Sequence, residues 1–431
     1  MTAPVTEISV NETWIHKNFC ARPYRVWLLL FVALGIFGLA QAPFAEIVHG
    51  YWLIITSSDV LVSDYIRIGG LGAAFVNVSL TGIFSLIVLK AAKHEPGGFV
   101  YGVLGLIGGI ALFGKNPVNM TPIVIGGILY AMIVKKPFSN NVLYTLLASC
   151  LAPAVTQLAL VEHVPTNLGI VLGILIGILI GLVVIPVCHH LRAAHAGMNL
   201  YNVGYGLGIF SIVLMLFFRF FGVDFGPRGY WSEGYDVELI VIMAIISVYF
   251  IIVGLLAKNT GSFLDMVRMK TDSIDYWGHY GARTHIAMGV LGLFCLVITL
   301  GAGGVSNGPI WGGALSVIGF GGFGKRLFAH ISLTIGTLIA AFGAWAIAGA
   351  QWNARGWVVA FIFVSCLSPF ASKYGWKWGI TAGIVHLAIV ANLAIFHGGM
   401  NLYNNGLAGG IAMMILVPIA RIMSKEEAAH H

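Results

Sequence analysis

Charged residues are scarce in this sequence: 9% of its 431 residues are Asp, Glu, Lys or Arg, whereas 58% are hydrophobic. A soluble domain of average composition carries about 25% charged residues. The mean hydropathy is +0.92. This deficit excludes an ordinary soluble fold and predicts an all-α, multi-pass protein of the cell (inner or plasma) membrane. Its apolar runs approach or exceed the roughly 20 residues that cross a bilayer core, and they lie at 25–48, 71–89, 167–188, 207–220, 239–256, 286–300, 356–372 and 380–396.

The sequence also lacks the motifs that hold metals or catalyse hydrolysis. Its five cysteines show no CxxC or CxxCH spacing, and there is no HExxH motif, paired-carboxylate motif or nucleophile–base spacing. We therefore predict neither an enzyme nor a bound metal or cofactor. The net charge of +7 comes from basic residues scattered through short loops. Such residues set the orientation of a membrane protein, so we predict no nucleic-acid partner.

Three sequence landmarks occur twice and in the same order. HAGMNLYN at 195–202 recurs as HGGMNLYN at 397–404, and FGK at 113–115 recurs at 323–325. The third landmark, SCLAP at 149–153, recurs as SCLSP at 365–369. A shared order at similar separations indicates two homologous halves, which we place at 15–225 and 230–425.

The distribution of charge predicts that the two halves have opposite orientations. Loops 45–69 and 221–238 are rich in Asp and Glu and are expected outside the cell. The basic residues expected inside are Lys17, Arg22, Arg25, Lys90, Lys93, Lys135, Lys136, Arg192, Lys258, Arg268, Lys270 and Arg283. Both termini are then cytoplasmic. The halves form inverted repeats of about 10–14 membrane segments in total, some of them re-entrant or broken, with a solute site near the midplane between the repeats.

The best candidate for a broken segment is FGKNPVNMTPIVIGG at 113–127, because Pro117 and Pro122 prevent a continuous helix. A helix that begins at either proline would aim its free N–H groups, which attract anions, at the preceding polar residues. The candidate residues there are Lys115, Asn116, Asn119 and Thr121, and those of the matching segment 323–337 are Lys325, Arg326, His330 and Ser332. The alternative is that the lysines and the arginine only mark loop ends.

The repeated cassettes supply the other candidate residues for binding a solute: Asn199, Tyr201, Asn202, Asn401, Tyr403 and Asn404. In a helix, asparagines three residues apart share a face. In hydrocarbon their amides must bond protein, water or solute. Two interpretations stay open: the amides contact a solute, or they join neighbouring helices.

The scarcity of Asp and Glu in the expected spans argues against a carboxylate proton relay and a cation pathway. We therefore predict a transporter or channel for a small polar neutral or anionic solute, surrounded by membrane lipids. The alternative function is a membrane-embedded redox or enzyme subunit, in which His285, His330 or His386 hold haem or a quinone. A structural scaffold is a third alternative, and a homo-oligomer is left open.

The paired GMNLYN cassettes and the FGKNPVNMTP element resemble a bacterial membrane-protein family catalogued only as a domain of unknown function. Its members carry two copies of the domain, and the resemblance covers nearly the whole chain. It implies duplication but no substrate. More loosely, two inverted halves with proline-marked polar elements are similar to the urea-transporter architecture, which implies a fold alone.

Overall fold

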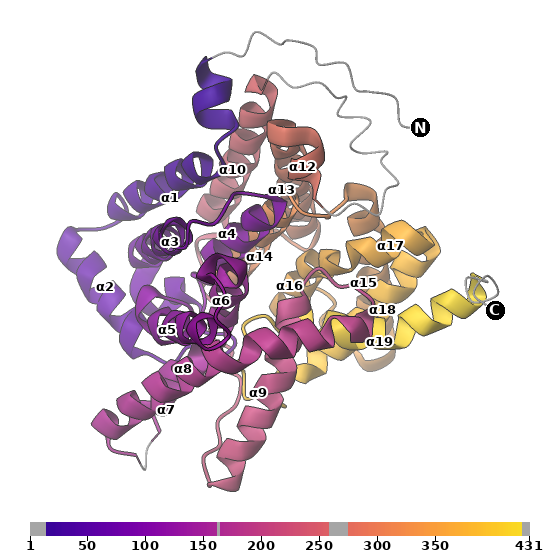
Figure 1. Ribbon diagram of the computed structural model, residues 1–431. Helices are drawn as coiled ribbons and strands as arrows, with labels where there is room; N and C mark the ends of the chain where they lie inside the picture. Colours follow the sequence, from indigo (N-terminus) through magenta and orange to yellow (C-terminus); the bar gives the residue numbers. More distant parts are fainter. Residues whose placement is uncertain (1–13, 162–163, 258–274, 425–431) are drawn as a thin grey trace.

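The computed structural model describes residues 14–161, 164–257 and 275–424 of the chain (Figure 1). It is 77% helical and has no β-strand within those residues. Lys258, Arg268 and Lys270, which carry part of the predicted orientation, lie outside the described residues.

Each half contributes a series of helices interrupted by short 3-10 turns (Figure 1). Those of the first half are α1 Pro23–Leu39, α2 Phe44–Thr56, α3 Tyr65–Ala91, α4 Gly98–Ile110, α5 Pro117–Ile133, α6 Val142–Ala148, η3 Ser149–Leu151, α7 Pro153–Leu158, α8 Thr166–Leu191 and α9 Asn202–Phe220. Those of the second half are α10 Asp236–Leu256, α12 Tyr276–Tyr280, η5 Gly281–Arg283, α13 Thr284–Gly301, α14 Gly308–Phe320, α15 Leu327–Ala348, α16 Arg355–Phe363, η6 Val364–Leu367, α17 Ser368–Tyr374, α18 Trp376–Leu393 and α19 Asn404–Met423.

The packing within the two halves matches element by element. Helix α1 packs on α3 as α10 packs on α13, and α5 packs on α8 as α15 packs on α18. The SCLxP segments form the 3-10 turns η3 and η6 at corresponding places, each followed by a short helix with proline in its first turn. The internal duplication seen in the sequence is therefore also a duplication of packing.

Helices α4 and α14 lie side by side at the centre and run in opposite directions (Figure 1). Gly102, near the start of α4, lies against Phe320 at the end of α14, whereas Gly109, near the end of α4, lies against Gly312 near the start of α14. Glycines let the two backbones approach closely, as is common between membrane helices. The antiparallel contact agrees with the predicted inverted arrangement of the halves.

Eight helices are long and apolar enough to cross a membrane within the described residues. The count reaches nine if α1 and α2 form one broken span, because they meet at a bend of 114°. Four shorter apolar helices, among them α4, α5 and α14, bring the apolar segments into the predicted range. The prediction of one continuous span over 25–48 is wrong, because the chain bends between Leu39, where α1 ends, and Phe44, where α2 begins. Pro43 immediately precedes α2, and a proline there cannot continue α1.

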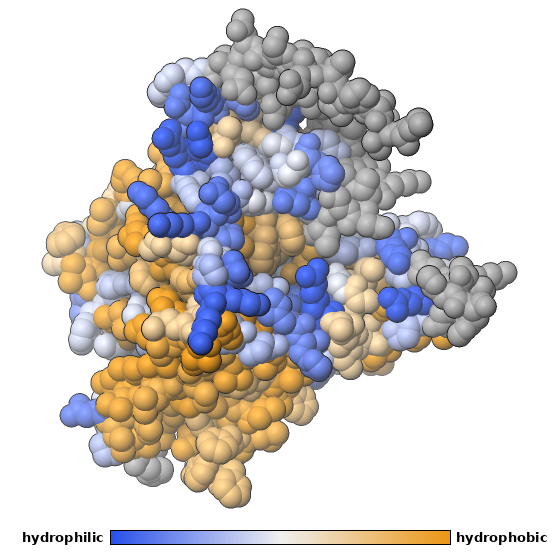
Figure 2. Space-filling view, viewed as in Figure 1, coloured by the Kyte–Doolittle hydropathy of each residue, from blue (hydrophilic) through white to orange (hydrophobic). Residues whose placement is uncertain are grey.

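The surface that would contact lipid is visible in the lower part of Figure 2, where apolar side chains gather. On α8 the exposed apolar side chains include Leu168, Ile170, Val171, Ile174 and Leu175, and on α9 they include Val213, Leu216, Phe217 and Phe220. A soluble protein rarely exposes an apolar surface of this extent. The protein is therefore a multi-pass membrane protein.

The segment before α3 is folded into the protein, which corrects the prediction of an open outer loop over 45–69. Residues 44–56 form α2, and the Asp59 and Asp64 side chains that follow are 0% exposed. The backbone of Leu61 bonds Gly399 and Arg228, so this segment joins both halves. Two acidic residues expected in solvent are thus buried.

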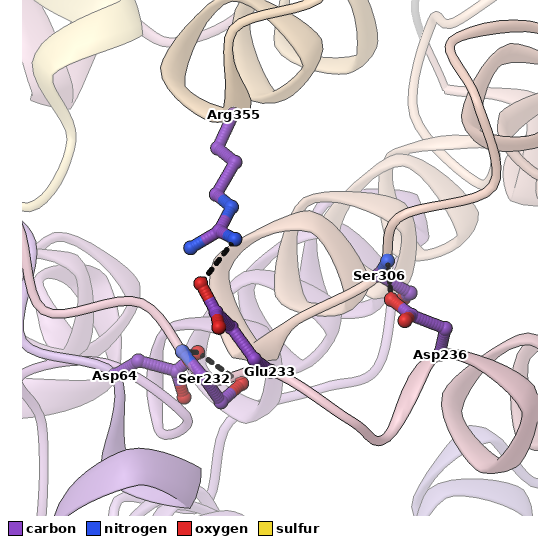
Figure 3. A network of polar contacts seen from close by, with 6 residues as sticks. All are labelled: Asp64, Ser232, Glu233, Asp236, Ser306 and Arg355. Atoms are coloured by element: carbon purple, nitrogen blue, oxygen red, sulfur yellow. Dashed lines mark hydrogen bonds and ion pairs between the residues drawn. The ribbon is translucent and has the colours of Figure 1, made fainter.

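The linker between the halves is held by further polar contacts, some of which Figure 3 shows. Ser232 donates its hydroxyl to the Asp64 carboxylate at 2.7 Å, and the Ser306 backbone N–H donates to Asp236 at 2.6 Å. Arg355 bonds the exposed Glu233 carboxylate at 2.6 Å, which lowers the pKa of Glu233. The Asp64 carboxylate also accepts from the backbone N–H groups of Ile66 and Gly308, so it caps both α3 and α14.

Candidate functional site

The two GMNLYN cassettes meet at the interface of the halves. Tyr201 and Tyr403 directly precede α9 and α19, and their ring centroids lie 4.5 Å apart. Both tyrosines are 1% exposed. The amide clusters therefore come together as the inverted arrangement predicts.

The first asparagine of each cassette bonds across the interface. Asn199 donates its side-chain amide to the Gly406 carbonyl at 2.9 Å, and Asn401 donates to the Gly204 carbonyl at 3.4 Å. Each side-chain oxygen also accepts a backbone N–H two residues along its own chain, from Tyr201 or Tyr403. The amide nitrogens thus join the starts of α9 and α19, whereas the amide oxygens bond within their own cassettes.

The second asparagine of each cassette bonds within its own half. The Asn202 side-chain oxygen accepts from the His195 ring at 2.8 Å, and its amide nitrogen donates to the Cys188 carbonyl at 3.1 Å. Asn404 repeats this arrangement with His397 and the Val390 carbonyl. All four cassette amides are bonded to protein groups, as the helix-joining interpretation predicts.

The cassettes also hold the 3-10 turns of the opposite half. The backbone N–H of Leu200 donates to the Cys366 carbonyl, and that of Leu402 donates to the Cys150 carbonyl. Backbone groups at the breaks of a helix need partners when they lie in an apolar surrounding. The duplicated GMNLYN and SCLxP motifs are therefore partners of one another across the interface.

Lys115 and Lys325 occupy equivalent breaks, one between α4 and α5 and the other between α14 and α15. Their exposures are 0% and 1%. The Lys325 ammonium donates to the Tyr201 hydroxyl and lies 4.5 Å from the centroid of that ring. The Lys115 ammonium instead lies 3.4 Å from the Cys150 sulfur. Neither lysine forms an ion pair with a described carboxylate.

The helix α5 begins at Pro117, one of the two predicted starts, whereas Pro122 lies inside the helix and does not interrupt it. The N-terminus of α5 is already occupied. The Asn116 side chain accepts the N–H groups of Val118 and Asn119, and Asn119 returns a bond to the Asn116 N–H. This capping box satisfies the donors that an anion would have used. Thr121 is exposed and bonds the Pro117 carbonyl, so its place in the predicted site is wrong.

The matching helix α15 carries the other predicted residues. Arg326 precedes the helix, is partly exposed and provides no side-chain cap. His330 is buried against Phe294 and interacts electrostatically with Lys325. Ser332 turns back to the Ala329 carbonyl of its own helix. Only Lys325 of this set reaches the tyrosine pair.

The histidines named for the alternative redox function are engaged with the protein. His285 bonds the Tyr101 hydroxyl through Nε2 and the Ala282 carbonyl through Nδ1. His386 lies 3.4 Å from the Asn405 carbonyl, and no group of three His, Cys, Asp or Glu within the described ranges could hold a metal ion.

Asp59 is a buried polar residue of this region that sequence reasoning missed. It lies in the segment between α2 and α3 and accepts from the Tyr65 hydroxyl at 2.6 Å and from the Asn119 amide at 2.9 Å. Burial raises the pKa of Asp59 to about 7. Its sequence position, beside an acidic and mostly polar stretch, was typical of a solvated loop, so nothing in the local pattern marked it as buried.

Comparison with known proteins identifies the family. A family model described as "Protein of unknown function (DUF1576)" matches the chain twice, at residues 44–220 and 262–422. The chain belongs to this family. No curated protein and no solved structure matches it. The DUF1576 assignment agrees with the predicted unknown-function family and with its two copies, whereas the urea-transporter likeness stays an analogy of architecture.

Proposed function

We propose that this membrane protein transports a small anion between its two inverted halves, past Lys115 and Lys325. The observation that carries the proposal is the pair of fully buried lysines at equivalent helix breaks. Neither lysine forms an ion pair with a carboxylate of the described residues. A buried ammonium without a counter-charge is costly, and an ionisable group in a membrane protein commonly marks a solute path. A bound anion supplies the missing charge.

The lysines stand at the two ends of a row of side chains that crosses the interface. Lys325 bonds Tyr201, whose ring packs at a tilt against that of Tyr403. Leu402, the residue before Tyr403, donates its backbone N–H to the Cys150 carbonyl, and the Cys150 sulfur accepts from Lys115. The two tyrosine rings lie in the middle of this row, so a solute that passes from one lysine to the other must displace them. This favours a carrier over a permanently open channel.

The chemistry of the row favours a small anion over a neutral solute. A neutral molecule would leave both ammonium groups without a counter-charge. Lysine offers a compact point charge, whereas the paired N–H groups of arginine suit planar carboxylates and phosphates held by two bonds.

We also propose that the protein lies in the cell (inner or plasma) membrane, and the distribution of Lys and Arg supports an orientation with both termini in the cytoplasm.

The test is anion uptake by proteoliposomes. Chloride, nitrate, formate, bicarbonate and sulfate are offered in turn to vesicles that contain the wild type, Lys115→Met or Lys325→Met. The control is Lys90→Met, which removes an exposed lysine at the end of α3. We expect uptake of at least one monovalent anion, a loss of ten-fold or more in each buried-lysine variant, and no change in the control. Uptake that is indifferent to both buried lysines would overturn the proposal.

A further inference from the structure

Asp59 is a carboxylate with neutral neighbours only. Its side chain is 0% exposed and accepts from the Tyr65 hydroxyl of α3 and the Asn119 amide of α5. The Thr156 hydroxyl of α7 lies beside them and accepts from the same Asn119 amide at 3.4 Å. Tyr51 of α2 lies near the Tyr65 hydroxyl. No described Lys, Arg or His is within ion-pair distance of Asp59. A buried carboxylate without a cation is costly when ionised, and it becomes neutral by binding a proton.

Two hydrogen-bonded routes connect Asp59 to the break that carries Lys115. In one, the Asn119 amide bonds both Asp59 and the Gly114 carbonyl, at 2.9 and 3.2 Å. In the other, the Tyr65 hydroxyl bonds Asp59 at 2.6 Å and accepts from the Asn116 amide at 3.3 Å. Gly114 and Asn116 are the residues on either side of Lys115. Asp59 is thus bonded, through one side chain each, to both neighbours of the lysine.

We infer that Asp59 binds the proton that this protein moves together with its anion. This coupling deepens the proposed function and rests on it. The cargo is then a proton and a monovalent anion carried in the same direction. The step is an acid–base reaction without electron transfer: an O–H bond forms on an Asp59 oxygen from one side of the membrane, and the same proton leaves to the other side.

Protonation changes the hydrogen bonds that hold the break. Ionised Asp59 accepts from the Tyr65 hydroxyl and the Asn119 amide, but its protonated form must itself donate one bond. The Thr156 hydroxyl can accept that bond, and the protonated oxygen then no longer accepts as before from Tyr65 or Asn119. Since those two side chains also bond Asn116 and Gly114, the backbone around Lys115 is released.

The charge on Asp59 also favours binding of the proton and the anion together. Ionised Asp59 repels an anion that approaches Lys115, and protonation removes the repulsion. The proton and the anion therefore favour one another, and by linkage each raises the affinity for the other by the same factor. The apparent affinity for the anion falls as pH rises through neutrality, because burial raises the pKa of Asp59 to about 7.

Within the described residues, the second half differs at the positions that match Asn116 and Asn119. Aligning the two FGK motifs places Ala329 where the first half has Asn119, and Arg326 where it has Asn116. Alanine has no polar side-chain atom, and arginine donates hydrogen bonds but cannot accept them as the asparagine oxygens do. The bonds that link Asp59 to the residues beside Lys115 are therefore not repeated beside Lys325.

The first experiment measures proton binding without any solute. Infrared difference spectra of the purified protein in detergent are recorded across neutral pH for the wild type, Asp59→Asn and the surface control Asp224→Asn. We expect a buried, protonated carboxylic acid that titrates in the wild type and the control and is missing in Asp59→Asn. If Asp59→Asn does not fold, Tyr65→Phe replaces it: losing a donor to the carboxylate must raise the titration midpoint. An unchanged titration in the variant overturns the inference.

The second experiment measures coupling. Proteoliposomes are given an inward proton gradient with a monovalent anion identified in the uptake panel. We expect the gradient to speed uptake several-fold in the wild type and in the surface control Asp224→Asn, and we expect Asp59→Asn to lose this response. A wild type that moves no anion refutes the proposed function itself. A wild type that moves anion at a rate indifferent to the gradient refutes proton coupling alone.

Discussion

Lys325 bonds the Tyr201 hydroxyl, whereas Lys115, its equivalent in the first half, bonds Cys150 and leaves Tyr403 without that bond. The Tyr403 hydroxyl is buried and has no hydrogen-bond partner among the described residues. The scaffold around these residues is closely duplicated, yet the two lysine contacts differ. The inverted halves are therefore asymmetric at their centre, where a solute would pass.

This asymmetry predicts that the same Tyr→Phe substitution changes the stability of the protein differently at positions 201 and 403. Tyr201→Phe removes the partner of a buried ammonium and should destabilise the protein by about 1–3 kcal/mol. Tyr403→Phe removes a hydroxyl that is unbonded, so the free energy of unfolding should stay the same or rise. Unfolding of both variants in detergent with increasing SDS measures the difference. Equal losses in the two variants would show that the contacts are symmetric after all.

The cassette asparagines are predicted to act on stability. Asn199→Ala and Asn401→Ala each remove an amide that joins α9 and α19 and leave a backbone group unbonded. We expect a loss of about 1–2 kcal/mol for each, since such bonds average about 0.6 kcal/mol before the unpaired group is counted. The control is Asn392→Ala, an exposed amide that bonds within α18. A change in anion affinity with unchanged stability would favour solute contact instead.

The membrane class and the duplication could be predicted because each depends on a pattern spread over many residues. Apolar length and the position of Lys and Arg are additive signals, and motifs such as GMNLYN mark the repeat directly. The start of α5 at Pro117 was also predictable, because proline excludes the preceding turn from the helix.

The site itself was less predictable, because its contacts join residues far apart in the chain. Nothing local indicates that Asn199 is bonded to Gly406, or that Lys115 meets Cys150. Asp59 was assigned to solvent since a short acidic stretch between apolar runs ordinarily is solvated, and only the packing of α5 and α7 around it reverses that assignment. Thr121 was included by its closeness to Pro117, although the helix turns it outward.

The close approach of α4 and α14 predicts a strong effect of one added methyl group. A Cβ at Gly109 would overlap the backbone of Gly312, so Gly109→Ala must push the helices apart and cost about 1–3 kcal/mol or more. Gly343→Ala is the matched control, because a Cβ there meets nothing within 4 Å in the interior of α15. That change should be neutral or stabilising by up to about 1 kcal/mol. Thermal unfolding in detergent distinguishes the two, and a tolerated Gly109→Ala would contradict the packing.

Substitutions of two carboxylates near the linker, Asp64 and Glu233, are predicted to change the free energy of unfolding by very different amounts (Figure 3). Asp64→Ala leaves the N–H groups of Ile66, Gly308 and Ser232 without their acceptor and should cost roughly 3 kcal/mol or more. Glu233→Gln removes only an exposed ion pair with Arg355 and should leave stability unchanged within error. The midpoints of SDS unfolding measure both. Similar midpoints for the two variants would show that Asp64 does not cap the helices.

The raised pKa of Asp59 predicts how the stability of the purified protein depends on pH. Its ordinary pKa near 4 applies in the unfolded chain, whereas burial raises the pKa in the fold to about 7. Between these values the folded state binds more protons than the unfolded state, so the free energy of unfolding falls as pH rises, and it levels off above about 7. The difference of three pKa units sets an upper limit on the order of 4 kcal/mol for this contribution to the free energy of unfolding.

Melting temperatures of the wild type and Asp59→Asn at several pH values measure this contribution as a difference between the two proteins. The asparagine variant, which cannot ionise, should lose this part of the slope and gain stability relative to the wild type toward alkaline pH. Parallel curves for the two proteins would mean that Asp59 titrates alike in the folded and unfolded states.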